Sequence, residues 1–367
     1  MSHDFSERLD RARQGLTRLG WSGLLIAPGA DLRYLTGYPA VALERLTCLV
    51  LPRDGEPTLV VPRLERPAAQ DSGVEAAGVR LLDYPDGTDP YPSVLRGIGA
   101  DAAILSVGDQ MWASHLLALQ AVLPQTRWQT ARRVLGPLRA RKSPAEVAAL
   151  AEAGAAIDAV HQRMGEWLRP GRTEREVAGD IARAIRETGH ATVDFVIVAA
   201  GPDAASPHHD TSDRTIGAGE PVVVDIGGTM PSGYCSDCTR TYVVGDAPPD
   251  FLEYYAVLQA AQRMAVTAVA PGVPAQDVDT AARTPIADAG YGPAFLHRTG
   301  HGIGLETHED PYIVAGNGEP LGEGMTFSIE PGIYLEGRHG ARIEDIVACT
   351  GTGVQRLNTT STDLVRL

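Results

Sequence analysis

The sequence predicts a mixed α/β protein with two domains, a smaller N-terminal domain over residues 1–140 and a larger C-terminal domain over residues 141–367. Length is the first indication, since 367 residues exceed what one hydrophobic core usually organises. The second indication is an alternation of strand-like and helix-like segments in the N-terminal part. The third is an internal repeat in the remainder, in which a turn, a helix and two acidic strands occur twice.

The N-terminal domain contains short apolar runs that are typical of strands. They lie at residues 23–27, 47–51 and 58–62. The turn signal in residues 54–57 separates the second run from the third. Helices are expected over residues 4–19 and within residues 110–122. These elements predict a mixed α/β arrangement for the first domain.

The boundary between the domains is expected in the basic run of residues 132–142, which we interpret as a solvated linker. Directly after it, Ser143 and Glu146 stand at the two ends of a capping box, with Pro144 at the first helical position. This pattern predicts a helix that opens the second domain.

The C-terminal domain repeats one helical pattern at a constant spacing. Pro170, Gly171, Val177, Ile185 and Gly189 recur as Pro271, Gly272, Val278, Ile286 and Gly290. A glycine-introduced strand that ends in a carboxylate follows each copy, at residues 219–225 and 324–330, and a second acidic strand comes after each. Chance similarity is the alternative for the helices alone. The matching acid pairs favour a pseudo-twofold pair of hairpins whose acids meet at one centre.

Four carboxylates in these strands and one glycine-flanked histidine form the candidate metal site. They are Asp225, Asp237, His301, Glu330 and Glu344. A carboxylate in an apolar strand is costly to bury unless it is paired or binds a metal. Four oxygen-donor side chains and one imidazole can hold two divalent ions about 3.5–4 Å apart, the spacing that activates water for hydrolysis. The sequence therefore predicts a dinuclear metal centre.

Composition and charge argue against several classes of protein. Hydrophobic residues make up 44% and charged residues 21%, as in an ordinary soluble enzyme. The net charge of −14 and the pI near 5.1 argue against nucleic acid or an anionic membrane as a partner. We find no secretory signal pattern, no apolar stretch of the ~20 residues that a membrane helix needs, and too few cysteines for a disulfide framework. The cytoplasm is the expected compartment.

Six motifs occur in order in the second domain. They are VDIG (224–227), SDCTRT (236–241), HRTGHGIG (297–304), HE (308–309), SIEPG (328–332) and RIED (342–345). Together with residues 31–38 in the first domain, they resemble the pita-bread metallopeptidases, in the branch of Xaa-Pro aminopeptidases (aminopeptidase P) and Xaa-Pro dipeptidases (prolidases). The interval from Asp225 to Asp237 is one residue longer than is common in that family, and we place the extra residue in the turn at 230–232.

The resemblance implies a C-terminal pita-bread (creatinase/aminopeptidase) fold with a pseudo-twofold repeat, a creatinase-like N-terminal α/β domain and a homodimer. It also implies a role for each ligand: Asp225 chelates one ion, Asp237 and Glu344 bridge both, and His301 and Glu330 bind the other. The oxygen-rich ligands suit Mn²⁺, with Zn²⁺ and Co²⁺ as open alternatives. Glu330 is the candidate general base.

Three further histidines match family positions and are predicted to be catalytic, namely His208, His297 and His308. Their predicted work is to hold the substrate carbonyl and to pass a proton to the leaving proline nitrogen. A structural role is the alternative for any single histidine. His209 is the less favoured of its pair, and His339 is expected only to line a hairpin.

Arg342 precedes Glu344 by two residues on the same predicted strand, so the two side chains share a face. Arg342 is therefore a candidate catalytic residue that pairs with an acid of the site or binds a substrate carboxylate, with a structural ion pair as the alternative. By the same argument, Thr239 is expected to orient Asp237. The C-x-x-C at residues 235–238 is interpreted as structural, because positions three apart on a strand face opposite sides.

These observations predict a metal-dependent exopeptidase that cleaves before proline in proline-containing peptides. We favour an Xaa-Pro aminopeptidase, because the sequence shows no additional basic cluster near the motifs to cap the pocket. An Xaa-Pro dipeptidase is the alternative within the family. From other classes, the alternatives are a non-catalytic binding protein on the same fold and a metal-free amidinohydrolase of the creatinase type, and both should lack the complete ligand set. The additional N-terminal domain argues against a methionine aminopeptidase.

Overall fold

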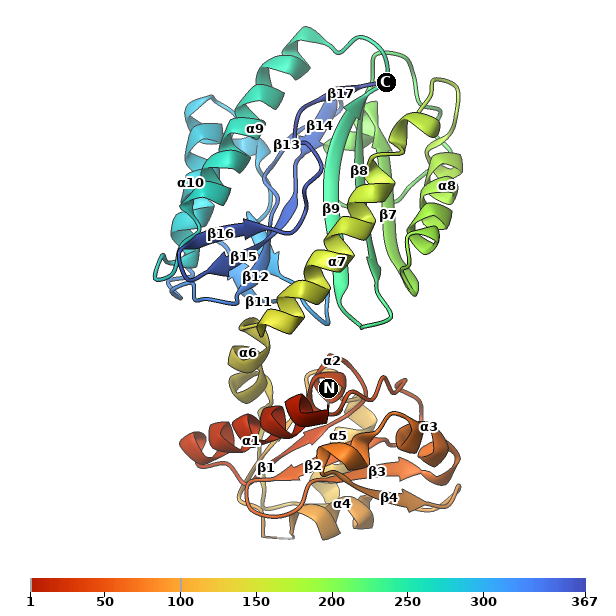
Figure 1. The fold of residues 1–367 in the computed structure, drawn as a ribbon, viewed down its shortest axis with the longest axis vertical. Coiled ribbons are helices and arrows are strands. Elements are labelled where there is room, and N and C mark those ends of the chain that lie inside the picture. The colour runs from red at the N-terminus through yellow and green to blue at the C-terminus, as the bar shows by residue number, and fades with distance from the viewer. Residues whose placement is uncertain (1, 100) are drawn as a thin grey trace. The chain divides into compact units, whose positions relative to one another are not determined.

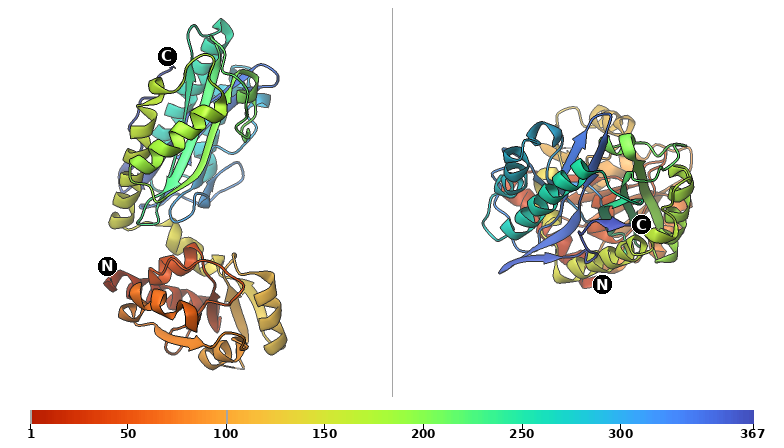
Figure 2. Two further views of the ribbon diagram at one scale, coloured as in Figure 1. Left: turned by 90° about the vertical axis from the view of Figure 1, so that its right-hand side faces the viewer. Right: turned by 90° about the horizontal axis from the view of Figure 1, so that it is seen from above.

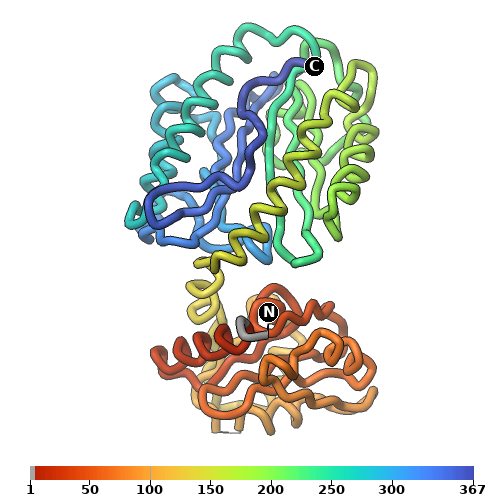
Figure 3. Tube along the Cα trace, in the orientation of Figure 1, coloured from red at the N-terminus to blue at the C-terminus, as the bar shows by residue number. Residues whose placement is uncertain are grey.

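The computed structural model describes residues 2–99 and 101–367, and these divide into two compact units. The first unit ends at Arg139, and the second runs from Ala140 to Leu367. In Figure 3 the colour of the chain runs from red in the N-terminal part to blue at the C-terminus. Each unit combines helices with β-sheet around its own hydrophobic core, so the predicted fold class is confirmed.

The first unit is built on a six-stranded sheet with the order β4-β3-β2-β1-β5-β6. The strands are β1 (Gly23–Ile26), β2 (Cys48–Pro52), β3 (Thr58–Pro62), β4 (Arg80–Tyr84), β5 (Ile104–Val107) and β6 (Arg127–Thr130). The pairs β1–β2 and β2–β3 are antiparallel, and the other three pairs are parallel. Every residue of β1, β2 and β3 is buried, which is typical of a sheet covered on both faces.

Helices alternate with these strands along the first unit. They are α1 (Ser2–Leu19), α2 (Ala30–Thr36), α3 (Arg66–Asp71), α4 (Tyr91–Ile98), α5 (Ala113–Val122) and α6 (Arg132–Ala140). The three predicted strands correspond to β1, β2 and β3, and the two predicted helices correspond to α1 and α5, so these predictions are confirmed to within a few residues.

The second unit consists of two similar halves with the helices on the outside (Figures 1 and 2). In the first half, α7 (Pro144–His161) and α8 (Glu174–Glu187) pack on β7 (Thr192–Ala200), β8 (Pro221–Thr229) and β9 (Cys235–Val243). In the second half, α9 (Pro249–Ala268) and α10 (Ala275–Asp288) flank a five-stranded sheet with the order β11-β10-β12-β15-β16. The repeated sequence pattern falls in α8 and α10, the second helix of each half.

The strands of the second half complete the unit. They are β10 (Gly300–Gly302), β11 (Glu309–Ile313), β12 (Thr326–Ile329), β15 (Asp345–Thr350) and β16 (Gly353–Arg356), with a separate hairpin of β13 (Gly332–Leu335) and β14 (His339–Arg342). The last strand, β17 (Val365–Arg366), returns to pair with β9 of the first half. The C-terminal segment thereby connects the two halves.

Helix α7 begins as its sequence predicts. The Ser143 side chain accepts a hydrogen bond from Glu146 N, and the Glu146 side chain accepts one from Ser143 N, so the capping box is complete. Glu146 also accepts a hydrogen bond of 2.7 Å from Tyr234 of the β8–β9 turn. Among the described helices, none is both long and apolar enough to cross a membrane.

The interpretation of residues 132–142 as a solvated linker is wrong for two of its charges. Most of this run is helix α6. Arg139 forms an ion pair of 2.8 Å with Asp31. Lys142 is buried and lies 2.6 Å from Glu309, whose side chain is also buried. The basic run therefore supplies buried cations that neutralise acids within each unit, which a count of charges along the chain does not reveal.

The Lys142–Glu309 pair yields a stability prediction. Replacing Lys142 with methionine leaves the Glu309 carboxylate buried without its cation, which typically costs about 3–5 kcal/mol. We expect Lys142→Met to lower the free energy of unfolding by that amount in urea denaturation followed by circular dichroism. The control is Arg175→Met, which removes an exposed pair with Asp213 and should change stability by less than about 1 kcal/mol. Equal effects of the two variants would contradict this account.

Candidate metal centre

The first pair of acids lies on the central strands of the four-stranded sheet. Asp225 is in β8 and Asp237 is in β9. The antiparallel pairing of these strands places Thr239 opposite Asp225, with Asp237 two residues further along. Since alternate residues of a strand share a face, all three side chains point to the same side of the sheet. Val224 packs into the core on the opposite side.

The second pair of acids lies at the corresponding place in the other half. Glu330 directly follows β12, and Glu344 directly precedes β15. The pairing of Ile329 with Asp345 puts the two glutamates at the next position of the same antiparallel ladder. His301 lies on β10, which neighbours β12 in this sheet. This half therefore offers two acids and a histidine from adjacent strands.

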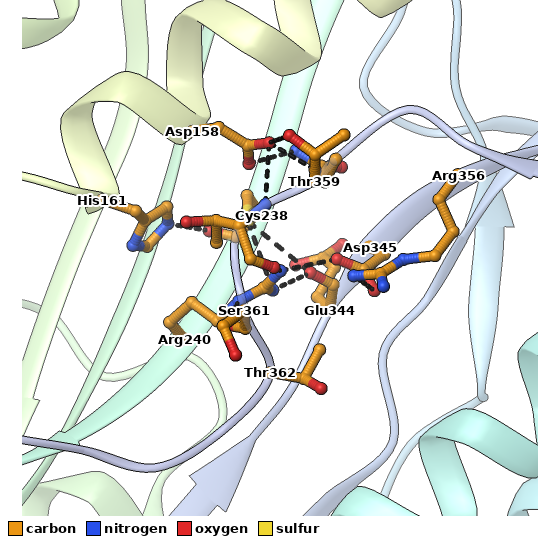
Figure 4. A network of polar contacts seen from close by, with 12 residues as sticks. Asp158, His161, Cys238, Arg240, Glu344, Asp345, Arg356, Thr359, Ser361 and Thr362 are labelled. Carbon is orange, nitrogen blue, oxygen red and sulfur yellow. Dashed lines mark hydrogen bonds and ion pairs between the residues drawn. The ribbon is translucent and has the colours of Figure 1, made fainter.

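A backbone hydrogen bond joins the two pairs of acids, because Glu344 N donates to Thr239 O over 3.1 Å. Figure 4 shows the polar network that supports this junction. The Arg240 guanidinium donates to Glu344 O and forms an ion pair of 2.6 Å with Asp345. Arg356 forms a second ion pair with Asp345 over 2.8 Å. The buried Arg240–Asp345 pair thus holds the backbone that carries Glu344, and the exposed Arg356 adds a second contact to Asp345.

Gly300 allows His301 to approach its neighbours. A Cβ atom at Gly300 would lie only 1.9 Å from Ser328 O, so no larger residue fits without separating β10 from β12. With glycine in place, His301 N donates to Ser328 Oγ over 3.0 Å, and this hydroxyl donates to Glu330 Oε1 over 3.0 Å. Ser328 therefore fixes the spacing between His301 and Glu330.

All five predicted ligands line one cavity of about 770 Å³. His301 Nε2 lies 3.1 Å from Glu330 Oε1 and 3.8 Å from Asp237 Oδ2. One ligand atom from each of Asp237, His301 and Glu344 falls within 4.8 Å of the other two. These three residues are 4%, 3% and 2% exposed. The fold therefore concentrates acidic side chains in a space with little access to water.

The donor atoms fit bound divalent cations. In the described part of the chain, Asp225 Oδ1 and Glu344 Oε1 are buried oxygens without a hydrogen-bond partner. Burial and the neighbouring carboxylates raise the pKa of Asp237 and the pKa of Glu344 well above their usual ranges. Burial alone would raise the pKa of Glu330, but the hydrogen bond and charge of His301 lower it to about 2. Uncompensated carboxylates of this kind require a positive charge, and a divalent metal supplies it.

The Arg342 guanidinium makes four contacts within the protein, one of them with an acid of the site. Its Nη2 lies 2.6 Å from Asp225 Oδ2, and its Nε donates to Thr239 Oγ1 over 3.1 Å. The Thr239 hydroxyl in turn donates to Glu344 Oε2 over 2.7 Å. The expectation that Thr239 orients Asp237 is therefore wrong, because the hydroxyl reaches across the junction between the two halves. Sequence spacing within one strand could not reveal that partner.

The three predicted catalytic histidines also line the cavity. His208 and His308 are exposed, and the His308 ring stands edge-on to His301 with 4.0 Å between ring centroids. Partial burial and the charge of His301 lower the pKa of His308 to about 4, so the ring is neutral at physiological pH. His297 is more enclosed, with Nδ1 2.7 Å from Arg298 O and Nε2 2.8 Å from the Tyr334 hydroxyl.

Other candidate side chains have structural partners. His209 Nε2 lies 2.8 Å from Glu174, whose carboxylate also accepts hydrogen bonds from Ala200 N and Ser212 N. His339 lies on the β13–β14 hairpin, and its Nδ1 is 2.9 Å from the hydroxyl of Tyr254 in α9. The cysteines of the C-x-x-C are buried and free.

Sequence reasoning missed two residues that line or support the cavity. The hydroxyl of Tyr334 contacts His297 and accepts a hydrogen bond from Arg342 Nη1 over 2.8 Å. Tyr334 shares a face with Arg342 only through the β13–β14 register, which pairs Gly332 with Arg342. Arg298 lines the cavity and stands beside His297 in a motif already noted, so its position was the available signal.

Buried carboxylates and a histidine around one cavity of an α/β fold are typical of metal-dependent hydrolases. Comparison with known families gives the same class. Residues 148–351 match the model described as metallopeptidase family M24, and residues 8–141 match the creatinase/prolidase N-terminal domain. The chain therefore belongs to metallopeptidase family M24, and the predicted resemblance to pita-bread metallopeptidases is confirmed.

Similar proteins match the chain from end to end. The "Probable dipeptidase PepE" of Mycobacterium tuberculosis is 50% identical over 98% of this chain and 96% of its own length. The crystal structure of dipeptidase PepE from Mycobacterium ulcerans is 53% identical and superposes with a TM-score of 0.95, over 100% of this chain and 98% of that chain. An Xaa-Pro dipeptidase of Lactobacillus delbrueckii subsp. lactis is 35% identical over 97% of this chain and 98% of its own length. The chain is thus a metal-dependent M24 peptidase.

The buried acids should lower the Tm of the metal-free protein and raise the Tm once metal is bound. Replacing one of them should therefore have opposite effects in the two states. An acid whose pKa rises on folding destabilises the folded state above its unfolded pKa of about 3.9, so Asp237→Asn should raise the Tm of the metal-free protein at pH 7. Saturating Mn²⁺ should raise the wild-type Tm by about 5–10 °C and leave the variant nearly unchanged. Differential scanning calorimetry measures both effects. The control, Glu253→Gln, alters an exposed acid of α9 and should behave as wild type. An unchanged wild-type Tm at saturating Mn²⁺ would rule out this metal site.

Proposed function

We propose that the chain is an Xaa-Pro dipeptidase, which hydrolyses the bond before proline in a two-residue peptide. The observation that carries the proposal is the end-to-end similarity to proteins named as dipeptidases, at 50% and 35% identity over nearly the whole of both chains. The cavity of about 770 Å³ is in the size range of small-molecule sites and accommodates a dipeptide. Residues 141–367 would form the catalytic domain and residues 1–140 the creatinase-like domain.

The preference for an aminopeptidase loses its basis. That preference relied on the lack of an additional basic cluster near the motifs that would cap the pocket. Arg298 belongs to the motif of residues 297–304 and lines the cavity, so the pocket does contain a second guanidinium group. The aminopeptidase remains the second candidate, because both activities share the same ligand set and the same position of cleavage.

The metal-binding residues we assign are Asp225, Asp237, His301, Glu330 and Glu344. We propose two divalent ions, with Mn²⁺ favoured by the oxygen-rich donors and Zn²⁺ or Co²⁺ as alternatives. When bound, the ions supply Lewis acidity to the scissile carbonyl and to the nucleophilic water. The cytoplasmic location and the homodimer stay predictions from the sequence.

Glu330 is the proposed general base. Its carboxylate is ionised and is oriented by Ser328 Oγ at 3.0 Å and His301 Nε2 at 3.1 Å. In the proposed reaction Glu330 takes a proton from the attacking water as the carbon–oxygen bond forms. The carbon–nitrogen bond then breaks, and the proton passes to the proline nitrogen.

The three histidines divide this work according to their hydrogen bonds. His297 Nδ1 faces a carbonyl and must donate to it, so Nε2 accepts from Tyr334, whose hydroxyl already accepts from Arg342. Both ring nitrogens of His297 are therefore engaged, and His297 is a positioning residue. His208 and His308 keep exposed rings at the cavity and are the groups that we assign to the substrate carbonyl and to proton delivery.

Substrate length tests the proposal. With Mn²⁺-loaded enzyme we expect kcat/KM for Ala-Pro to exceed that for Ala-Pro-Ala by about tenfold or more, a difference of about 1.4 kcal/mol in transition-state binding. Ala-Ala should be a poor substrate. Comparable cleavage of Ala-Pro-Ala and longer peptides would identify an aminopeptidase instead. Equal cleavage of Ala-Ala would exclude both forms of proline specificity.

A further inference from the structure

The cavity wall contains two guanidinium groups, Arg298 and Arg342, and they differ in what they already bind. A dipeptidase has to recognise the free carboxylate of its substrate, and an arginine is the side chain best suited to grip a carboxylate with two parallel hydrogen bonds. The question is which of the two guanidinium groups is free to do so.

Arg342 is committed to the protein itself. It is 3% exposed and forms an ion pair of 2.6 Å with Asp225. Its other nitrogens donate to Thr239 Oγ1, to the Tyr334 hydroxyl and to Pro207 O at 3.1, 2.8 and 3.2 Å. Binding a substrate carboxylate would require Arg342 to give up Asp225. Arg342 therefore orients an acid of the metal site and leaves no free fork of donors.

The Arg298 guanidinium forms no comparable set of hydrogen bonds with the described residues. Among the described residues, no carboxylate forms an ion pair with Arg298, and its guanidinium lies over the ring of Tyr312 with 4.6 Å between Cζ and the ring centroid. Stacking on an aromatic face occupies the flat side of the guanidinium and leaves the N–H groups at its edge available. Arg298 is half-buried at the cavity wall, so those donors are accessible to a ligand there.

The position of Arg298 is fixed by the surrounding backbone. His297 Nδ1 donates to Arg298 O over 2.7 Å, and Arg283 Nη2 donates to His297 O over 2.8 Å. The stacking partner Tyr312 pairs with His301 across β10 and β11, so the platform under Arg298 is built on the strand beside a proposed metal ligand. The backbone of Arg298 and the ring on which its guanidinium lies are therefore both anchored next to the strand that carries His301.

The many acidic side chains of the cavity wall make a cation necessary for binding a substrate carboxylate. Apart from Arg298 and the paired Arg342, the acidic and basic side chains of the cavity wall other than histidine are carboxyl groups, namely those of Asp194, Asp225, Asp237, Glu330 and Glu344. A substrate carboxylate entering such a cavity needs a cation that is not already neutralised, and Arg298 is the guanidinium that meets this condition.

We propose that Arg298 binds the C-terminal carboxylate of the substrate proline and thereby restricts the enzyme to dipeptides. The inference rests on the proposed dipeptidase function and names the residue that would set it. In a longer peptide an uncharged amide takes the place of the carboxylate, and the following residue is directed at Arg298. Such a substrate lacks the charge-assisted hydrogen bonds to Arg298. Its additional residue would also collide with the Arg298 side chain, which lies over the Tyr312 ring.

The experiment compares Ala-Pro with its carboxamide, Ala-Pro-NH₂, which has the same size and lacks the charge. For Arg298→Met we expect KM for Ala-Pro to rise about 10- to 100-fold, because hydrogen bonds to charged groups are lost, with kcat changed much less. Values for Ala-Pro-NH₂ should stay within about twofold of wild type. Arg298→Lys keeps the positive charge but cannot form two parallel hydrogen bonds, so its KM for Ala-Pro should lie between those of wild type and Arg298→Met.

A binding measurement removes the dependence on turnover. Isothermal titration of the Mn²⁺-loaded protein with the uncleavable reduced dipeptide Ala-ψ[CH₂N]-Pro and with its carboxamide should show that Arg298→Met loses the preference for the carboxylate form. Arg186→Met, an exposed arginine of α8, is the matched control and should keep it. Calorimetric unfolding of each variant checks that the fold is intact.

The outcomes separate the two proposals. Wild-type preference for Ala-Pro over Ala-Pro-Ala, combined with equal losses on Ala-Pro and Ala-Pro-NH₂ in Arg298→Met, would overturn the role of Arg298 and leave the dipeptidase in place. Wild-type preference for Ala-Pro-Ala would overturn the dipeptidase and, with it, the inference that depends on it. A selective loss on the free carboxylate supports both.

Discussion

The burial of four carboxylates at the meeting point of two half-domains is the constraint on which this structure depends. Asp225 and Asp237 come from one sheet, and Glu330 and Glu344 come from the other. Since charges of one sign repel and burial deprives them of water, these carboxyl groups are ionised together only at a free-energy cost, which bound cations would offset. Fold and metal affinity are therefore coupled, because the same carboxylates that strain the empty protein supply the binding energy when ions are present.

Much of the surrounding polar structure serves to hold these acids in place. Arg342 neutralises Asp225 from the side, and Arg240 holds the backbone of Glu344 from behind. Tail residues also bind the network, since Asp158 of α7 accepts hydrogen bonds from the backbone of Thr359 and Thr360. The two halves could not slide past each other without breaking several buried hydrogen bonds, each of which leaves an unsatisfied polar group. These contacts hold the acids at fixed places relative to one another, which is the condition for positioning a scissile bond.

The sequence was sufficient to predict local features of the fold and of the site. Capping residues such as Ser143 and Glu146 mark the start of α7, and the acidic strands with their glycine introductions identify both halves of the site. What the sequence could not supply were partners across elements. Lys142 looks solvated until Glu309 is seen beside it, and Thr239 serves Glu344 rather than an acid on its own strand. Arg298 stood within a recognised motif, yet its availability becomes evident only once the contacts of the cavity wall are known. Periodicity reports which face a residue occupies, whereas the group opposite that face depends on tertiary register.

The most direct test of the account is anomalous X-ray scattering at the manganese absorption edge from crystals grown with Mn²⁺. Two anomalous peaks are expected in the cavity, one beside Asp225 and the other beside His301 and Glu330, with Asp237 and Glu344 close to both. No peak in this cavity, or a single ion bound instead among Glu174, Asp203 and His209, would contradict it.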